Sequence, residues 1–129
     1  MAQQLSLVSL IVRDYDEAIE FYTEKLGFTL VEDTNMGDKR WVVVKPKGSS
    51  GSAILLAKAK DADQAEYIGR QGAGRVWLFL TTDDFWEDYL QMQRAGVEFL
   101  EQPRVESYAT VVVFADLYGN KWDLLQRNI

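Results

Sequence analysis

The fold is decided by residues 12–28, which read VRDYDEAIEFYTEKLGF. Asp14 and Glu17 have the spacing of a capping box, in which side chains three positions apart satisfy the free N–H groups at the start of a helix. The apolar residues that follow recur at helical spacing: Ala18, Ile19, Phe21, Tyr22 and Leu26. Gly27 then offers the left-handed backbone that ends many helices. The stretch predicts an amphipathic helix that begins at Asp14 and ends before Gly27.

Short apolar runs surround this helix, and each has the length and the bounding residues of a strand. They cover residues 5–12, 28–32, 41–44 and 53–57, with a turn at 48–51. Residues 58–74 differ in character, because they carry Ala, Gly, Gln and charged residues without strand periodicity. They predict a connector with one short helix near residues 61–68.

The same order of patterns returns after the connector. Asp83 or Asp84 caps a second helix, which is expected to end at Gly96. Strands are expected at residues 76–81, 97–100, 110–114 and 121–125, with a turn at Gly119-Asn120 before the last of them.

An ungapped shift of 69 positions superimposes the two halves of the sequence. The residues that coincide are Asp14 with Asp83, Gly27 with Gly96, and the valine triplet 42–44 with 111–113. Each half reads as a strand, a helix and three further strands. The expected fold is α+β, a single domain of two βαβββ modules at about residues 5–57 and 74–127, joined by a connector at 58–73.

Each module can cover one face of its sheet with its own helix, and the other face needs a second partner, either the other sheet or a ligand. We expect the two modules to form one curved mixed sheet around a cleft. Function is expected in that cleft, since concave sites between packed elements are where small ligands bind.

The composition excludes several classes of function. The chain has 129 residues with no cysteine and no histidine, so disulfides, thiolate metal sites and imidazole chemistry are absent. The formal net charge of −6 argues against nucleic acid, which needs clustered Lys and Arg, and suits a cationic small molecule better. No apolar run reaches the roughly 18 to 20 residues of a membrane span, and no signal-peptide pattern is present. A cytoplasmic protein without membrane or nucleic-acid partners is expected.

Several motifs of the chain resemble those of a known protein family. The segments are VRDYDEA at 12–18, Phe21-Tyr22, Leu26-Gly27-Phe28, and FADLYGN at 114–120. Together they resemble the vicinal-oxygen-chelate superfamily, which contains glyoxalase I, bleomycin-resistance proteins, fosfomycin-resistance proteins and extradiol dioxygenases. Leu117 stands where that family's F-x-D-P-x-G-N turn usually has proline. The resemblance covers essentially the whole chain, and it implies the glyoxalase/bleomycin-resistance-like fold of paired βαβββ modules and a homodimer.

In metal-using members the resemblance implies four ligands, one in the first and one in the fourth strand of each module. The corresponding positions here are Leu7, Val76, Ile54 and Asp123. Three of them are aliphatic, and one carboxylate cannot supply the three or four protein ligands of a zinc or iron site. A shift of register by one residue would bring Ser6 or Ser9 and Leu55 there, but no histidine. We therefore expect no metal and no cofactor, with a divalent metal ion as the alternative.

Strand alternation predicts which side chains face the cleft. With Leu7 and Val76 in the cleft, the other cleft-facing residues are expected to be Ser9, Ile11, Ile54, Leu56, Leu78, Leu80, Asp123 and Leu125. The residues expected to face the helices are Trp77, Phe79, Trp122 and Leu124. Trp41 and Tyr108 precede the valine triplets, and we expect them to form aromatic walls for a flat or cationic ligand. Core or dimer packing is the alternative for both.

Asp123 is the candidate functional residue, because an ionised carboxylate among apolar side chains is costly unless it is paired. It would act as the counter-ion of a cationic ligand, or as a general base with a raised pKa. The alternatives are exposure at a strand end or a salt bridge to one of three cations: Arg40, Lys39 or Arg104.

Functions of different classes follow from these expectations. The first is a metal-independent protein that binds a small molecule, cationic or antibiotic-like, as members of the bleomycin-resistance branch do in a homodimer. The second is an atypical glyoxalase- or dioxygenase-like lyase or isomerase that uses a divalent metal, or Asp123 as the base. A dimeric scaffold with an unknown ligand is the third.

Overall fold

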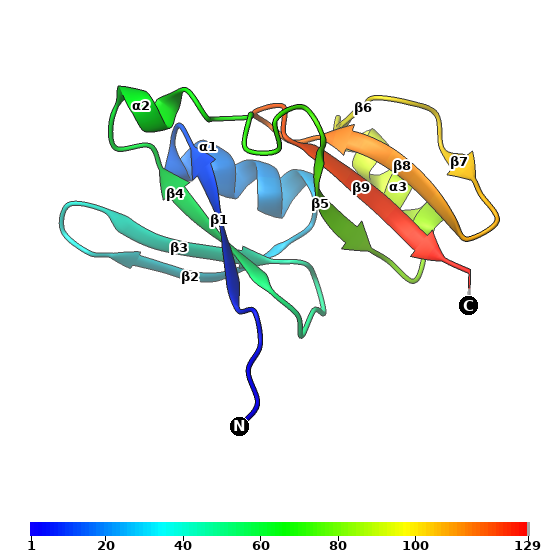
Figure 1. The fold of residues 1–129 in the computed structure, drawn as a ribbon, viewed down its shortest axis with the longest axis horizontal. Helices are drawn as coiled ribbons and strands as arrows, with labels where there is room; N and C mark the ends of the chain where they lie inside the picture. The colour runs from blue at the N-terminus through cyan, green and yellow to red at the C-terminus, as the bar shows by residue number, and fades with distance from the viewer. Residues whose placement is uncertain (129) are drawn as a thin grey trace. The chain divides into compact units, whose positions relative to one another are not determined.

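The chain folds into two compact units, residues 1–68 and the residues from 69 onward, each built on its own β-sheet (Figure 1). This computed structural model describes residues 1–128. Both sheets mix parallel and antiparallel strand pairs and each carries a helix, so the expected α+β fold class is confirmed. Within the described residues, no helix has the length and apolar character needed to cross a membrane.

The first unit contains a four-stranded sheet in the order β1-β4-β3-β2. β1 pairs with β4 in parallel, and the other two pairs are antiparallel. Its elements are β1 Leu7–Val12, α1 Tyr15–Glu20, η1 Phe21–Lys25, β2 Thr29–Asn35, β3 Arg40–Lys45, β4 Ala53–Lys58 and α2 Ala62–Ala65. The strands and helices predicted for this half are present, with ends that differ by a few residues.

The second unit contains a sheet in the order β5-β9-β8-β6, in which β7 also pairs with β8. Its elements are β5 Val76–Thr81, α3 Phe85–Arg94, β6 Glu98–Phe99, β7 Arg104–Val105, β8 Ala109–Ala115 and β9 Lys121–Arg127. The strand predicted at 97–100 is shorter than expected, and β7 was not predicted. Pro103 lies between β6 and β7, where a residue without an N–H cannot donate to a neighbouring strand.

The first helix begins and ends as its sequence predicts. The side chain of Asp14 accepts a hydrogen bond from the backbone N–H of Glu17 at 2.9 Å. Gly27 has a φ of +75°, the left-handed conformation that the chain needs to leave the helix. Between these ends, α1 passes into the π-helical turn η1, which contains one residue more per turn than an α-helix.

The extra residue of η1 explains why the two halves do not keep a constant offset. The N-cap residues Asp14 and Asp84 are 70 positions apart, whereas the terminating glycines Gly27 and Gly96 are 69 apart. Asp84, and not Asp83, is therefore the N-cap of α3.

The strands show a similar drift. The ungapped shift of 69 preserves the pairing of the third and fourth strands, since Val42 with Leu56 becomes Val111 with Leu125. It does not preserve which pair is fully buried: that pair is Val42 with Leu56 in the first unit and Val112 with Leu124 in the second. Matched by burial, the third strands are 70 positions apart and the fourth strands 68. The repeated order of elements was predicted correctly.

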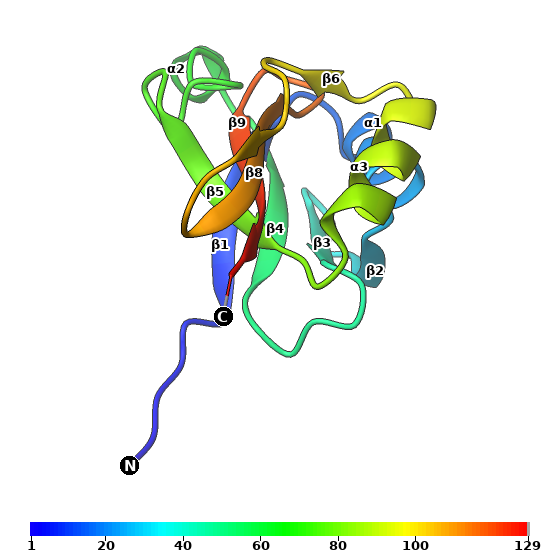
Figure 2. The ribbon, with the colours of Figure 1, turned by 90° about the vertical axis from the view of Figure 1, so that its right-hand side faces the viewer.

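Each sheet buries one face against its own helix. Figure 2 shows α1 along its sheet and α3 along the sheet of the second unit. The largest fully buried side chains are Tyr22, Phe85, Phe114, Leu10, Leu56 and Leu124, with four valines. In the second unit the rings of Phe114 and Trp122 stack at a centroid distance of 5.8 Å. This apolar layer fixes which residues of every strand are turned away from the helix.

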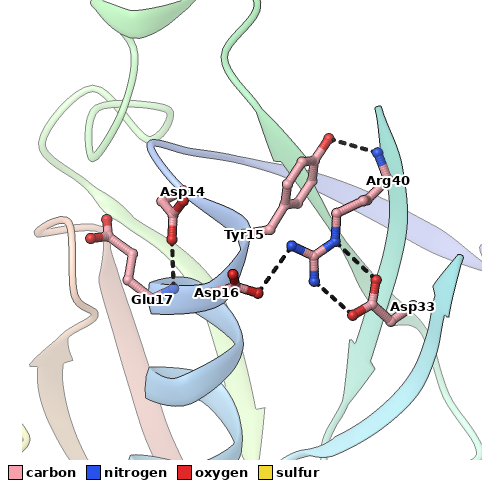
Figure 3. Close-up of polar contacts among 6 residues, drawn as sticks. All are labelled: Asp14, Tyr15, Asp16, Glu17, Asp33 and Arg40. Atoms are coloured by element: carbon pink, nitrogen blue, oxygen red, sulfur yellow. Dashed lines mark hydrogen bonds and ion pairs between the residues drawn. The ribbon is translucent and has the colours of Figure 1, made fainter. Parts of the chain in front are cut away.

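Arg40 joins the β2–β3 hairpin to the start of α1 (Figure 3). Its Nε and one Nη donate to the carboxylate of Asp33 at 3.1 and 2.7 Å, and its other Nη lies 3.0 Å from a carboxylate oxygen of Asp16. The guanidinium carbon lies 5.0 Å from the centroid of the Tyr15 ring. The tyrosine hydroxyl accepts from the backbone N–H of Arg40 at 3.3 Å. The hydrogen bond from Arg40 lowers the pKa of Asp33 below its usual value.

We predict that Arg40→Met lowers the free energy of unfolding by about 1 to 2 kcal/mol, because several charge-assisted hydrogen bonds are lost together. Urea denaturation at pH 7 measures this. Since the folded-state pKa of Asp33 is lowered, its contribution is present above the ordinary carboxyl pKa and is lost as the pH falls through the lowered value. The difference between wild type and variant should therefore shrink in acid.

The matched control is Arg13→Met. Arg13 forms an ion pair with Glu17 on the same stretch of chain, and 70% of its side chain is exposed. We expect this change to cost less than about 0.5 kcal/mol. Equal losses in the two variants would contradict the special role of Arg40.

Candidate functional site

The face of the second sheet that is turned away from α3 carries the candidate site. Residues opposite each other on paired strands share a face, so pairing places Phe79 and Val113 beside Asp123, and Val111 beside Leu125. Arg104 on β7 lies opposite Val111 and therefore joins this face. We call it the distal face, defined by six residues: Phe79, Arg104, Val111, Val113, Asp123 and Leu125.

Asp123 is the unusual member of the distal face. Its Oδ1 is shielded from solvent and has no protein hydrogen-bond partner among residues 1–128, and the carboxylate forms no ion pair with a described residue. Burial raises the pKa of Asp123, an effect that Glu101 reinforces and the positive charge of Arg104 opposes. The result is a carboxyl group with an unused acceptor atom among apolar neighbours.

Arg104 does not supply that partner, because other groups hold it. Its Nε lies 3.1 and 3.2 Å from the two carboxylate oxygens of Glu101, and one Nη lies 3.5 Å from Glu106. A side-chain hydrogen bond with Tyr108 adds to these contacts. Arg40, another cation considered as a partner for Asp123, is engaged with Asp16 and Asp33 of the first unit.

Glu101 is itself fixed to the sheet. One of its carboxylate oxygens accepts from the backbone N–H of Val113 at 3.0 Å, and Val113 lies directly opposite Asp123. The N–H of Leu100 meanwhile donates to the carbonyl of Val113 at 2.9 Å. The Glu101 carboxylate thus occupies the place that a strand carbonyl would take if β6 continued.

The expected faces of β5 are wrong after its first residue. Val76 pairs with Lys121 and lies on the distal side as predicted. The register then shifts between Val76 and Leu78, and Leu78 pairs with the buried Trp122. Leu78 and Leu80 therefore face the helix, whereas Phe79 faces the distal side with 64% of its surface exposed. One extra residue in a strand reverses the facing of every side chain that follows.

The first sheet divides the predicted residues in the same way. Leu7 and Ser9 alternate with the fully buried Leu10 and Val12, so they lie on the face away from α1, as expected. Ile54, with Leu56, lies on the helix side instead, because Val8 and Leu10 are their partners on β1. The offset of 68 between the fourth strands makes Leu55 the counterpart of Asp123.

The two predicted aromatic walls differ in environment. Trp41 alternates with the buried Val42 and lies half-buried on the side of its sheet away from α1. Tyr108 precedes β8, is 59% exposed, and contacts Arg104. Of the residues predicted for a ligand, Asp123 and Val76 lie on the same side of the second sheet, whereas Tyr108 lies at the other end of β9, where its carbonyl accepts from the N–H of Asn128.

The residues at the family's metal positions do not fit a metal ion. Leu7 and Val76 have no donor atom, and neither Ile54 nor its replacement Leu55 supplies one. Within residues 1–128, no group of three or more His, Cys, Asp or Glu side chains is placed to hold a cation. A carboxylate without such companions does not make a catalytic metal site.

The sequence predicted Phe79 to lie in the core and gave no role to Glu101. The bulge in β5 exposes Phe79, and it cannot be recognised from the sequence, because strand prediction assumes that side chains alternate regularly between the two faces. Pro103, two residues after Glu101, was the available signal, since it predicts an interrupted strand with unpaired backbone groups on its neighbour.

Comparison with known proteins places this fold among relatives. A family model described as the Glyoxalase/Bleomycin resistance protein/Dioxygenase superfamily matches residues 4–124. An uncharacterized protein of Shewanella frigidimarina (strain NCIMB 400) is 55% identical over 130 residues, which cover 99% of this chain and 96% of that protein.

Two solved structures are similar over nearly their whole length. The crystal structure of UcmS2 has a TM-score of 0.84 and 31% identity, covering 97% of this chain and 98% of UcmS2. TnmS3, an antibiotic binding protein from Streptomyces sp. CB03234, has a TM-score of 0.81 and 28% identity, with 98% of each chain covered. These matches confirm the resemblance read from the motifs at 12–28 and 114–120. The chain belongs to the Glyoxalase/Bleomycin resistance protein/Dioxygenase superfamily.

Proposed function

We propose that this protein binds a small molecule without a metal ion, and that Asp123 on the distal face receives a cationic or hydrogen-bond-donating group of the ligand. The observation that carries the proposal is the shielded Oδ1 of Asp123, which has no protein hydrogen-bond partner among residues 1–128. The similarity to TnmS3, an antibiotic binding protein, supports a ligand of antibiotic-like size and chemistry.

The energetics favour a ligand over a purely structural role. A buried acceptor without a hydrogen bond costs about 1 to 3 kcal/mol, and a ligand N–H or O–H group would recover that cost. Phe79, beside Asp123 and largely exposed, offers a ring against which a flat ligand can stack. The net charge of −6 attracts cations and repels nucleic acid. A cytoplasmic homodimer with no nucleic-acid or membrane partner completes the proposal.

One observation favours a second candidate function. The raised pKa of Asp123 is typical of a general base, so a lyase or isomerase reaction at this carboxylate is the alternative. This enzyme would need an abstractable proton on its substrate close to the Asp123 oxygens. The two candidate functions use the same site. They differ in whether the ligand is released unchanged or is converted to a product.

We predict that cationic or phenolic polycyclic aromatic compounds raise the melting temperature of the protein, and that anionic analogues do not. Asp123→Asn and Phe79→Ala should each weaken binding by about tenfold, the size expected for one hydrogen bond to a charged group or one aromatic contact. Thermal-shift screening followed by fluorescence titration measures both effects.

Trp86→Ala is the matched control for Phe79→Ala. Trp86 is half-exposed on α3 in the same unit and is not part of the distal face. Binding unaffected by both Asp123→Asn and Phe79→Ala would place the ligand elsewhere, and Trp86→Ala should leave binding unchanged. Mass spectrometry of the recovered ligand separates binding from turnover.

We predict that Asp123→Asn increases the free energy of unfolding at pH 7, because it removes a charge that burial disfavours. The sign follows from the raised folded-state pKa: the wild-type protein loses stability as the pH rises from the ordinary carboxyl pKa through the raised value. The two proteins should therefore become equally stable below about pH 4. Urea denaturation between pH 3 and 8 tests this, with the exposed Asp38→Asn as a control that should stay near zero. A destabilised Asp123→Asn variant at pH 7 would contradict the prediction.

We also predict that purified, dialysed protein holds no stoichiometric divalent metal, and that zinc, manganese or magnesium leaves its melting temperature unchanged. Elemental analysis and thermal shift measure this. A metal at one equivalent per chain that disappears in Asp123→Asn would overturn metal independence and favour the enzyme.

A further inference from the structure

Glu101, Arg104 and Glu106 form a group of linked charges around β7. We propose that Glu101 and Glu106 are positioning residues that hold Arg104 away from Asp123, so that the distal face selects cationic or hydrogen-bond-donating ligands over anionic ones. This inference rests on the function proposed above and names the residues that determine its specificity.

Arg104 is placed where it could neutralise Asp123. It lies on the distal face, two strands from β9, because β7 pairs with β8 and β8 pairs with β9. Arg104 shares a row with Val111 and Leu125, two residues along the strands from the row of Val113 and Asp123. The two backbones are therefore roughly 12 Å apart, a gap that the arginine and aspartate side chains together largely span. The positive charge of Arg104 already acts on Asp123, whose pKa it lowers against the effect of burial. We expect Arg104 to form an ion pair with Asp123 when its competing partners are removed.

The two glutamates are the competing partners. Glu101 takes the Nε of Arg104 at 3.1 Å while one of its oxygens stays bonded to the N–H of Val113, so this carboxylate is fixed to the sheet. Glu106 takes a guanidinium nitrogen at 3.5 Å. Two carboxylates against one guanidinium leave the group with a net negative charge.

Among the described residues of β9, the two cations are not placed to compensate. Lys121, two residues from Asp123, donates its ammonium to the carbonyl of Gly74 at 3.0 Å. Arg127 lies at the far end of β9, four residues away and exposed. An anionic ligand would therefore meet a carboxyl and an arginine that is already neutralised, whereas a cation or a neutral donor would meet the Asp123 carboxyl, whose Oδ1 has no hydrogen-bond partner among residues 1–128.

The group belongs to the second unit alone. In the first unit β2 continues past the corresponding point after a register shift between Leu30 and Glu32, and the carboxylate of Glu32 accepts from Thr34 at 2.8 Å. In the second unit the break between β6 and β7 frees the N–H of Val113 for a side chain. The interrupted strand therefore places Glu101 and Arg104 together.

A double-mutant cycle tests the positioning role without a ligand. The coupling between Arg104→Met and Asp123→Asn is measured by urea denaturation, in wild type and in the Glu101→Gln/Glu106→Gln background. Glutamine keeps an oxygen for the N–H of Val113. We expect coupling below about twofold in the unfolding equilibrium constant in wild type, and about three- to tenfold in the glutamine background, where Arg104 turns to Asp123.

Equal coupling in the two backgrounds, or strong coupling already in wild type, would overturn the proposal. Glu106→Gln alone leaves the bond to Val113 untouched and serves as a second background if the double variant does not fold. A smaller rise in coupling is expected there, and no rise counts against the proposal.

Two fluorescent probes of opposite charge test the specificity. Ethidium is a cationic aromatic compound, and anilinonaphthalene sulfonate is an anionic one. In Glu101→Gln/Glu106→Gln we expect ethidium to bind about tenfold more weakly than to wild type, which is the effect expected for the loss of one charge partner. Binding of the sulfonate should be unchanged or tighter. Adding Arg104→Met should restore ethidium binding, which a merely structural role of the glutamates would not do.

Unchanged preference in the glutamine variant would overturn the specificity role while leaving the binding site itself intact. If neither probe binds wild type, the proposed binding function fails for these compounds and the specificity role fails with it. The ligand-free cycle still decides on its own whether the glutamates restrain Arg104.

Discussion

The pairing of β9 with β5 and β8 is the constraint on which the candidate site depends. A strand turns successive side chains to opposite faces, so this register decides that Trp122 and Leu124 are buried against α3 and that Asp123 is not. The stacked rings of Phe114 and Trp122 lock the register, because a slip by one residue would place an aspartate in the apolar layer. The unusual environment of the carboxylate is thus a consequence of how firmly its neighbours are packed.

The sequence predicted what depends on local chemistry. The cap at Asp14, the left-handed Gly27 and the order of strands and helices follow from residues a few positions apart, and these predictions were correct. The side of the sheet on which Ile54 and Leu78 lie was predicted wrongly. That outcome depends on single-residue insertions, the bulge in β5 and the π-helical turn, which change register without changing hydrophobic periodicity. An ungapped comparison of the two halves uses one constant shift, so it does not detect these single-residue insertions.

Asp123 illustrates how a binding site and a stable fold make opposite demands. A hydrophobic side chain at this position would remove the unsatisfied acceptor, and its counterpart in the first unit is indeed Leu55. The nearby Arg104 would also satisfy it, at the cost of closing the acceptor to any ligand. The structure adopts neither solution, because Glu101 and Glu106 keep the arginine occupied. Retaining a destabilising group where two remedies lie close by is typical of functional positions.

The duplicated units have diverged at the positions that matter for chemistry. Where the second unit has Phe79, Val113 and Asp123 side by side, the first has Ser9, Val43 and Leu55. The same scaffold therefore presents a serine beside two aliphatic residues in one unit and a carboxyl beside an exposed ring in the other. The family's metal chemistry needs donors from both units, and a single-unit carboxylate cannot meet that need. Recognition of a ligand by one hydrogen bond and one aromatic contact needs only the second unit. Asp123 and Phe79 have the chemistry for this kind of recognition.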